Sequence, residues 1–389
     1  MNFDEIINRV GTHSSKWDMT KPLYGVDPNE GISMWVADMD FRPPQVVNDA
    51  LQARIDHGVF GYFADDSAYT GALANWLEKR HGFIANPSHM IQAHGLVQGL
   101  SMCLEAFTEK GDGVIIFTPV YHAFARTINA MGREVVSSAL ANKNGLYEMD
   151  LDALQASLKG REKMIILCSP HNPGGRVWSV EELRALYAFA KKNDLLIVSD
   201  EIHMDLVFSG HKHHVFGSAV PEANDRVVYL MSSTKTFNIA GAMTGTLLAP
   251  DQKLRAKLTA VQMAWGIGVN LFGMIACTAA FESGEKWLEE AVPYIEENAR
   301  LLNEGLAKIP GVKPMQLQST YLSWVDFRDL GLETKDLHNR IHQDAKIAAN
   351  HGDTFGDAGK GFLRFNVATP RANVLRAIEN IQEAFKDIQ

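Results

Sequence analysis

Short apolar runs alternate with helix-length segments along much of the chain, from about residue 50 to residue 285. The segment at 180–193, for example, has the length of a helix and is rich in Glu, Leu, Ala and Lys. Apolar runs without polar alternation predict strands that are buried on both faces, and helices between such strands predict a mostly parallel sheet. The clearest predicted strands lie at residues 114–117, 164–167, 195–198 and 227–230.

The pattern changes after residues 282–284, Glu-Ser-Gly. A long amphipathic helix is predicted at about 286–306, and shorter strands and helices follow it. The first 45 residues show weak periodicity and are expected to wrap around this C-terminal part. We therefore predict a large α/β domain at residues 46–285 and a smaller α+β domain from residues 1–45 and 286–389. Its predicted elements are strands at 321–325 and 362–367 and helices at about 333–345 and 371–386.

Length and composition agree with an ordinary globular protein of two domains. The 389 residues exceed what one hydrophobic core usually supports; 46% of them are hydrophobic and 21% are charged. The net charge of −9 argues against nucleic acid or an anionic membrane as the main partner. No secretory signal and no apolar run of about 18 residues is visible, so we expect a cytoplasmic protein. Three widely spaced cysteines are expected to be buried free thiols: Cys103, Cys168 and Cys277.

Three polar groups each follow a predicted strand. Asn172 lies in Ser-Pro-His-Asn-Pro-Gly-Gly, Asp200 in Ser-Asp-Glu-Ile-His, and Lys235 in Ser-Ser-Thr-Lys-Thr. The carboxyl ends of neighbouring parallel strands meet at one edge of a sheet, where open α/β sheets bind ligands. An amine, a carboxylate and an amide that converge there are what a pyridoxal 5′-phosphate (PLP) enzyme needs. The sequence therefore predicts PLP as the cofactor and an amino acid as the small-molecule substrate, and it predicts no metal site.

Each of these three residues has a predicted role and an alternative. Lys235 would bond covalently to the cofactor and later move the Cα proton, instead of being a solvated surface lysine. Asp200 would face the pyridine nitrogen and keep it protonated; the alternative is an N-cap of the next helix. Asn172 would donate to the ring 3′-oxygen and also contact the substrate; its alternative is a plain β-turn.

Further residues are predicted to complete the cofactor site. His203 is a second candidate donor to the ring oxygen, or else a satisfied structural histidine. Tyr121 follows the first of the four strands and would stack on the ring, or else pack in the core. The phosphate would meet free amides at the start of a helix and hydroxyl groups beside the lysine. These phosphate-binding candidates are Gly95, Leu96, Val97, Ser232 and Thr234.

Arg364 is the candidate anchor for the substrate carboxylate. It lies in the otherwise apolar run Gly-Phe-Leu-Arg-Phe-Asn, where a guanidinium without an anionic partner is costly to bury. The alternative is a buried structural ion pair. Two other features are interpreted without function. The run His-Lys-His-His at 211–214 follows Ser-Gly in a predicted turn, and the glycines within 352–361 lack the βαβ context of a dinucleotide site.

As a set, these residues resemble fold-type I PLP enzymes of the class I/II aminotransferase superfamily, over essentially the whole chain. Within the superfamily, the chain is most similar to the cystathionine β-lyase-type C–S lyases (the MalY/PatB-like branch). Aminotransferases proper usually carry tyrosine where this chain has His203. The motifs that carry the resemblance lie at 16–18 (Lys-Trp-Asp), 35–41 (Trp-Val-Ala-Asp-Met-Asp-Phe), 60–62 (Phe-Gly-Tyr), 169–173 (Ser-Pro-His-Asn-Pro), 175–178 (Gly-Arg-Val-Trp), 199–205 (Ser-Asp-Glu-Ile-His-Met-Asp), 235–241 (Lys-Thr-Phe-Asn-Ile-Ala-Gly) and 319–322 (Ser-Thr-Tyr-Leu).

The resemblance implies the PLP-dependent transferase fold, with a mostly parallel seven-stranded sheet in the large domain. It also implies a homodimer with active sites at the subunit interface. Tyr62 would then reach the cofactor phosphate of the neighbouring subunit, and Ala37 would lie near the substrate. Two positions depart from related enzymes: Met243 stands where many aspartate aminotransferases carry a phosphate-binding arginine, and His351 stands where this branch often has proline.

By the same resemblance, the expected reaction is an α,β-elimination that releases a thiol from cystathionine or cysteine-type substrates. With cystathionine the products would be homocysteine, pyruvate and ammonia. The alternative reaction is transamination by a PLP-dependent amino-acid aminotransferase. Both reactions begin with removal of the Cα proton, and no physical feature of the sequence forces one outcome. A third hypothesis, of another class, is a regulatory binding protein that keeps the same fold.

Overall fold

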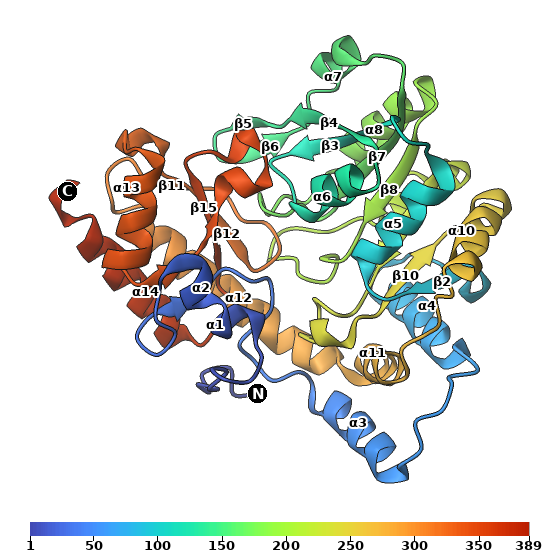
Figure 1. The fold of residues 1–389 in the computed structure, drawn as a ribbon, viewed down its shortest axis with the longest axis horizontal. Coiled ribbons are helices and arrows are strands. Elements are labelled where there is room, and N and C mark those ends of the chain that lie inside the picture. Colours follow the sequence, from blue (N-terminus) through green and yellow to red (C-terminus); the bar gives the residue numbers. More distant parts are fainter. Residues whose placement is uncertain (389) are drawn as a thin grey trace.

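The four apolar runs form the inner strands of a seven-stranded sheet in the computed structural model, which describes residues 1–388 (Figure 1). The strand order is β2-β10-β9-β8-β7-β3-β4, and only β10 runs antiparallel to its neighbours. The predicted mostly parallel seven-stranded sheet is therefore confirmed. Its strands are β2 (Met90–Ala93), β3 (Gly113–Thr118), β4 (Glu134–Ala139), β7 (Glu162–Cys168), β8 (Leu196–Asp200), β9 (Val227–Met231) and β10 (Gly245–Leu248).

Helices cover both faces of this sheet, because alternate side chains of a strand point to opposite faces. In β3, Ile115 and Phe117 pack into one core with α4, α8 and α11, whereas Val114 and Ile116 pack into a second core with α5, α6 and α10. The helices of this part are α3 (Gln45–His57), α4 (Ser67–His81), α5 (Leu96–Phe107), α6 (Ala123–Ala130), α7 (Leu151–Ser157), α8 (Val180–Lys192), α9 (Phe216–Ala219), α10 (Gln252–Ala264) and α11 (Leu271–Ser283).

The C-terminal part has the predicted α+β character. A four-stranded antiparallel sheet, in the order β11-β12-β15-β14, packs with α12 and α14. The long helix α12 lies along both parts of the molecule (Figure 1). The elements are α12 (Glu285–Leu306), β11 (Lys313–Pro314), β12 (Leu322–Asp326), α13 (Thr334–Asn339), β13 (Ile347–Ala348), β14 (Asn350–His351), β15 (Phe362–Asn366) and α14 (Arg371–Ala384). The helix predicted at 333–345 is shorter than expected, because α13 gives way to a π-helical turn at Arg340–Asp344.

N-terminal residues pack against this C-terminal part. Strand β1 (Ile32–Ser33) pairs in parallel with β13, and the Phe3 ring contacts the rings of Trp287 and Tyr294 in α12. The remaining elements are α1 (Ser15–Asp18), α2 (Thr20–Tyr24) and the hairpin of β5 (Ala141–Lys143) and β6 (Leu146–Glu148). All three cysteines are buried and free. Among the described helices, none is long and apolar enough to cross a membrane.

The register of the sheet brings the ends of three strands together. Cys168 at the end of β7 pairs with Asp200 at the end of β8, and Asp200 pairs in turn with Leu230 of β9. The loops that follow β7 and β9 therefore leave the sheet at the same edge as Asp200. These loops carry Asn172 and Lys235.

Candidate active site

Lys235 lies in the loop after β9, and other residues hold its amine. Its Nζ donates a hydrogen bond of 2.5 Å to the carbonyl of Ala37, which also accepts one of 2.9 Å from the Tyr321 hydroxyl. The neighbouring Thr236 hydroxyl donates to the buried Asp205 carboxylate at 2.8 Å. Desolvation lowers the pKa of the Lys235 amine to about 8, with the Arg364 charge adding to the shift and two carboxylates opposing it. The lysine is therefore a fixed amine that is easier to deprotonate than an exposed one.

Asp200 is buried at the end of β8 without an ion-pair partner among residues 1–388. Its carboxylate accepts the Ile202 amide at 3.1 Å, and burial raises the pKa of the carboxyl to about 7. No helix follows it, so the alternative of a helix N-cap is wrong; Asp200 closes a turn instead. A buried acid without a cation is unfavourable. A protonated ring nitrogen is a group that would stabilise it.

Arg364 is buried in β15 among neutral partners. Its guanidinium donates to the Asn172 amide oxygen (3.0 Å), the Asn350 amide oxygen (2.5 Å) and the Trp35 carbonyl (2.8 Å), and it lies over the Phe355 ring. Within the described chain no carboxylate pairs with it, so the alternative of a structural ion pair is wrong. Its Nε is buried without a partner. Burial lowers the pKa of Arg364 to about 10, which leaves it charged and able to bind a carboxylate at neutral pH.

Asn172 and His203 each retain a group suited to the cofactor ring. Arginine can only donate, so the Asn172 atom facing Arg364 is the oxygen, and the amide nitrogen is left as a donor. His203 is 2% exposed and its Nδ1 has no hydrogen-bond partner in the described chain. Burial and the Lys235 and Arg364 charges lower the pKa of His203 to about 3, so it is neutral. Tyr121 donates its amide to the Asn172 carbonyl at 3.0 Å, which places it at the same edge.

The predicted phosphate site lies at the first turn of α5. Gly95 precedes the helix with φ of 83°, a conformation that favours glycine, and the amides of Leu96 and Val97 begin the helix. The Ser232 hydroxyl donates to the Thr244 carbonyl at 2.7 Å, so its proton is engaged; the Thr234 hydroxyl lies 2.9 Å from it. Met243, which replaces an arginine of related enzymes, is 55% exposed and lies beside Gly95. The phosphate would therefore meet amides and hydroxyls, not a guanidinium from this position.

Taken together, these observations fit PLP. The unpaired carboxylate of Asp200, the unpartnered Nδ1 of His203 and the free donors of Asn172 match a protonated pyridine nitrogen and a ring oxygen. The amides at the start of α5 match a phosphate. The roles of the individual residues stay predictions.

Comparison with known proteins places the chain in a family. The model of the family "Aminotransferase class I and II" matches residues 31–381. The chain belongs to the class I and II aminotransferase family. Among its curated relatives is "Cystathionine beta-lyase PatB" of Bacillus subtilis, 39% identical, with 99% of this chain and 100% of the relative covered.

Solved structures of this aminotransferase family are similar over the whole chain. Cystalysin from Treponema denticola, described as containing pyridoxal 5′-phosphate, has a TM-score of 0.95 and 32% identity, covering 100% of this chain and 99% of its own. The PLP-bound C–S lyase from Staphylococcus hominis has a TM-score of 0.91 and 33% identity, covering 99% and 98%. The PLP-dependent transferase fold predicted from the sequence is therefore confirmed.

Sequence reasoning gave no role to two residues that contact the site, and it gave one role that depends on a second subunit. Tyr62 is fully exposed in the single chain, and its role in a neighbouring subunit stays a prediction. Tyr321 and Asn350 contact site residues but received no predicted role, although Tyr321 stands in one of the motifs that carry the resemblance to the C–S lyases. His351 stacks on His338 and lies 2.7 Å from His342, so it shapes a histidine-rich corner beside Asn350.

We expect uptake of PLP by the cofactor-free protein to follow the ionisation of Lys235. Only the neutral amine attacks an aldehyde, so the rate should rise with pH, reach half of its maximum at about pH 8 and level off above that. At pH 7.4 about a fifth of such amines are neutral, roughly two orders of magnitude more than for an exposed lysine. The measurement is the rate of the absorbance change on mixing protein and PLP between pH 6 and 10. A rate that still rises above pH 9.5 would contradict the lowered pKa.

Proposed function

We propose that the protein is a PLP-dependent C–S β-lyase that acts on cystathionine or related cysteine derivatives. The full-length relation to a cystathionine β-lyase carries this proposal, together with a site whose geometry fits an amino acid beside PLP. Bound PLP would supply an electron-withdrawing ring that stabilises negative charge at the substrate Cα. Loss of a thiolate from Cβ would leave 2-aminoacrylate, and its hydrolysis by one water molecule would give pyruvate and ammonia.

The chain's own residues divide the work. Arg364 binds the substrate carboxylate through its guanidinium, with Asn172 beside it to align the fork. Lys235 is the catalytic base that takes the proton from Cα, because its amine has a lowered pKa and a fixed direction. Asp200 keeps a proton on the ring nitrogen. Ala37 lies beside the Lys235 amine, so we propose that the substrate passes close to its carbonyl.

Transamination is the alternative reaction. The family is named after aminotransferases, and an aspartate aminotransferase is among the relatives of this chain. The two reactions differ in their need for a 2-oxo acid as acceptor. We expect release of thiol from L-cystathionine to be unchanged when a 2-oxo acid is added. Turnover that requires the 2-oxo acid would make the protein an aminotransferase.

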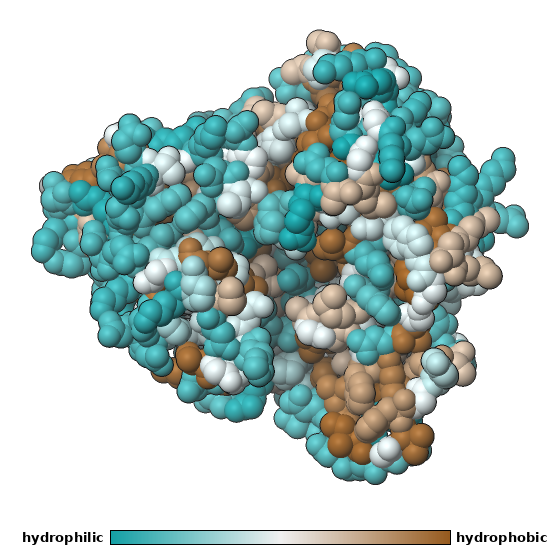
Figure 2. Space-filling model, in the orientation of Figure 1, coloured by the Kyte–Doolittle hydropathy of each residue, from teal (hydrophilic) through white to brown (hydrophobic). Residues whose placement is uncertain are grey.

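We further propose a homodimer in which Tyr62 of each subunit reaches the cofactor phosphate of the other. Apolar side chains are exposed on and near the loop that follows α3, and Figure 2 shows apolar surface over this part of the molecule. The Phe60 ring contacts the Phe272 ring at the start of α11, which supports the loop from behind. The exposed apolar residues here are Ile55, Val59, Phe60, Tyr62 and Phe272. An apolar patch of this kind favours contact with a second copy.

Subunit mixing tests the exchange of Tyr62. The Tyr62→Ala and Lys235→Ala variants should each be weakly active alone, Tyr62→Ala because a hydroxyl donor to the phosphate is lost. After dissociation and random reassembly, half of the dimers would be mixed and hold one intact site, so about a quarter of the wild-type activity should return. Phe272→Ser is a matched probe of the apolar contact and should weaken dimerisation without touching the site. A monomer in sedimentation, or no recovered activity, would contradict the proposal.

We retain two further proposals from the sequence. The chain divides into a large domain at residues 46–285 and a small one from 1–45 and 286–389, supported by the pairing of β1 with β13. The protein acts in the cytoplasm, which the three free buried cysteines support.

A further inference from the structure

The segment at residues 35–39 runs directly beside the candidate active site. Its Trp35 carbonyl accepts from Arg364 at 2.8 Å, and its Ala37 carbonyl accepts from Lys235 at 2.5 Å and from Tyr321 at 2.9 Å. Two carbonyls of one short, bent segment therefore hold the two cationic side chains that the proposed function uses. The position of this segment decides where both of them point.

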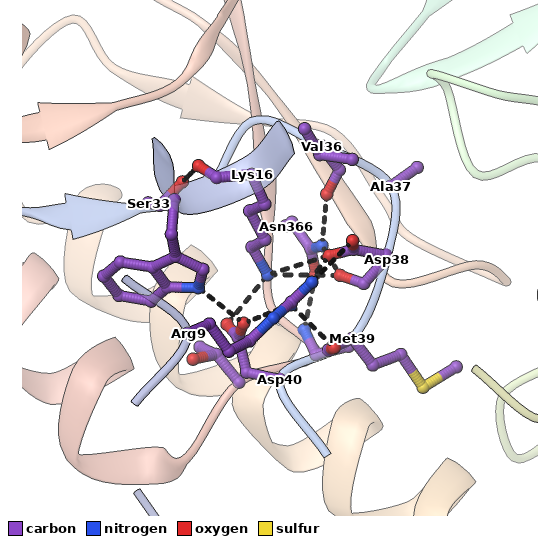
Figure 3. A network of polar contacts seen from close by, with 12 residues as sticks. Arg9, Lys16, Ser33, Val36, Ala37, Asp38, Met39, Asp40 and Asn366 are labelled. Carbon is purple, nitrogen blue, oxygen red and sulfur yellow. Dashed lines mark hydrogen bonds and ion pairs between the residues drawn. The ribbon is translucent and has the colours of Figure 1, made fainter. Parts of the chain in front are cut away.

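Other donors hold the remaining carbonyls of the same segment. Asn366, which is completely buried in β15, donates to the Val36 carbonyl at 2.6 Å and to the Asp38 carbonyl at 2.5 Å. Lys16 donates to the Asp38 carbonyl at 3.1 Å, and Arg9 to the Met39 carbonyl at 3.1 Å. Figure 3 shows these side chains converging on the segment.

Ion pairs lie at the end of the segment (Figure 3). Arg9 pairs with both Asp38 and Asp40, and Lys16 pairs with Asp40. Lys16 is 0% exposed and its Nζ lies 2.8 Å from Asp40, which is 4% exposed. Asp40 also accepts from Arg9 at 2.8 Å and from the Trp17 indole at 2.9 Å. Burial alone would raise the pKa of Asp40, but the charges and hydrogen bonds of Lys16, Trp17 and Arg9 hold it below its ordinary value.

The Lys16 ammonium is completely buried, which is unusual for a lysine outside a binding site. Buried ion pairs add little net stability compared with apolar side chains of the same size, but they fix geometry, because each partner is satisfied in few positions. Lys16 touches no group that we assign to catalysis. Its ammonium donates to Asp40 and to the Asp38 carbonyl and lies 3.8 Å from the Asp38 carboxylate, and its own carbonyl accepts from the Trp35 indole at 2.9 Å. Such a residue influences the reaction through the position of the 35–39 segment, including its Asp38 carboxylate.

We propose that Lys16 and Asp40 are positioning residues for the reaction: their buried ion pair fixes the 35–39 segment, whose carbonyls 35 and 37 aim Arg364 and the free amine of Lys235. This inference rests on the proposed function for its kinetic consequences only. A change in the position of the Lys235 amine would also change its pKa. The carbonyl of Ala37 and the nearby Asp38 carboxylate both favour the charged amine, so a displaced segment lowers the pKa of Lys235 further.

Lys16→Met tests this role, since methionine has a similar length without charge or donor. We expect the folded variant to lose about 10- to 100-fold in kcat/KM, with effects on both kcat and KM, because two groups are misaligned. In the cofactor-free protein, the pH midpoint of PLP uptake should fall by at least about 0.5 unit. Hydrogen exchange of the Met39 and Asp40 amides, which donate to Asn238 and Ala368, should accelerate. Lys16→Arg keeps the charge and should restore part of each effect.

The matched control is Arg42→Gln. Arg42 follows the same segment but pairs with Glu5 at the surface, where both side chains are well exposed. This variant should keep the wild-type kinetics, midpoint and exchange. If Lys16→Met does not fold, Asp40→Asn, which keeps the shape of the side chain, carries the same expectations. A folded variant with wild-type kcat, KM, midpoint and exchange overturns the proposal.

Failure of the proposed function gives a different result from failure of this inference. If the wild-type protein releases no thiol but Lys16→Met still shifts the midpoint and the exchange, the lyase proposal fails and the positioning role stands. If the wild-type protein is a lyase and Lys16→Met loses only thermal stability, the ion pair is merely structural and the inference is wrong.

Discussion

Replacement of Lys235 by alanine is expected to abolish steady-state elimination, with a loss on the order of 10³-fold or more in kcat. The reason is that one amine has two tasks in the proposed reaction, covalent attachment of the cofactor and removal of the Cα proton. In this structure the Lys235 amine is held by the Ala37 carbonyl. The measurement is pyruvate release from L-cystathionine by the purified variant with added PLP.

Two controls make the Lys235 result specific. Lys212→Ala removes an exposed lysine of the turn after β8 and should leave the rate unchanged. A small primary amine, such as methylamine, should restore part of the activity of Lys235→Ala, because it can take the proton that the side chain no longer takes. Wild-type activity in Lys235→Ala without any added amine would refute the assigned base and the whole catalytic scheme.

Replacement of Asp200 by asparagine should have the second-largest effect, a fall of about 10²- to 10³-fold in kcat with a smaller change in KM. Asparagine has the shape of aspartate but cannot hold a proton on the ring nitrogen as an anion does. The carboxyl group is buried without an ion-pair partner among the described residues, and burial raises its pKa to about 7. A protonated ring nitrogen would supply the positive partner. Substrate binding through Arg364 does not involve it.

The Asp200 experiment compares kcat and KM of Asp200→Asn with those of Asp194→Asn. Asp194 is fully exposed at the other end of the same βα unit and makes only a long contact of 3.7 Å with Arg226. Asp194→Asn should behave as the wild type. A variant of Asp200 with a normal kcat and a raised KM would mean that the carboxylate binds substrate and does not act on the ring.

The sheet and much of the site could be predicted because both depend on short-range patterns. Strands buried on both faces are continuous apolar runs, and β3, β7, β8 and β9 all appear at the predicted positions. Lys235, Asp200 and Asn172 each follow such a run, so a parallel sheet brings them together. Strand β4 was missed because it lies at the edge of the sheet and carries Glu and Ser, which break the apolar pattern.

Other parts of the site depend on contacts that no local pattern encodes. The ion pair of Lys16 and Asp40 joins two residues of the N-terminal part. Its proposed role depends on the 35–39 backbone, which contacts both Arg364 and Lys235. Asp200 was open to interpretation as a helix cap until the chain after it proved to form a turn. The predicted role of Tyr62 depends on a second subunit, so it stays a prediction; in the single chain the side chain is fully exposed.

The measurement that tests the central claim most directly is the product balance from L-cystathionine in the absence of any 2-oxo acid. The purified protein, loaded with PLP, is mixed with an excess of substrate, and pyruvate, ammonia and free thiol are followed together. The account predicts equal amounts of all three, released over many turnovers by each active site. A single change in cofactor absorbance, with no pyruvate and no further turnover, would contradict it and assign the protein to the aminotransferases.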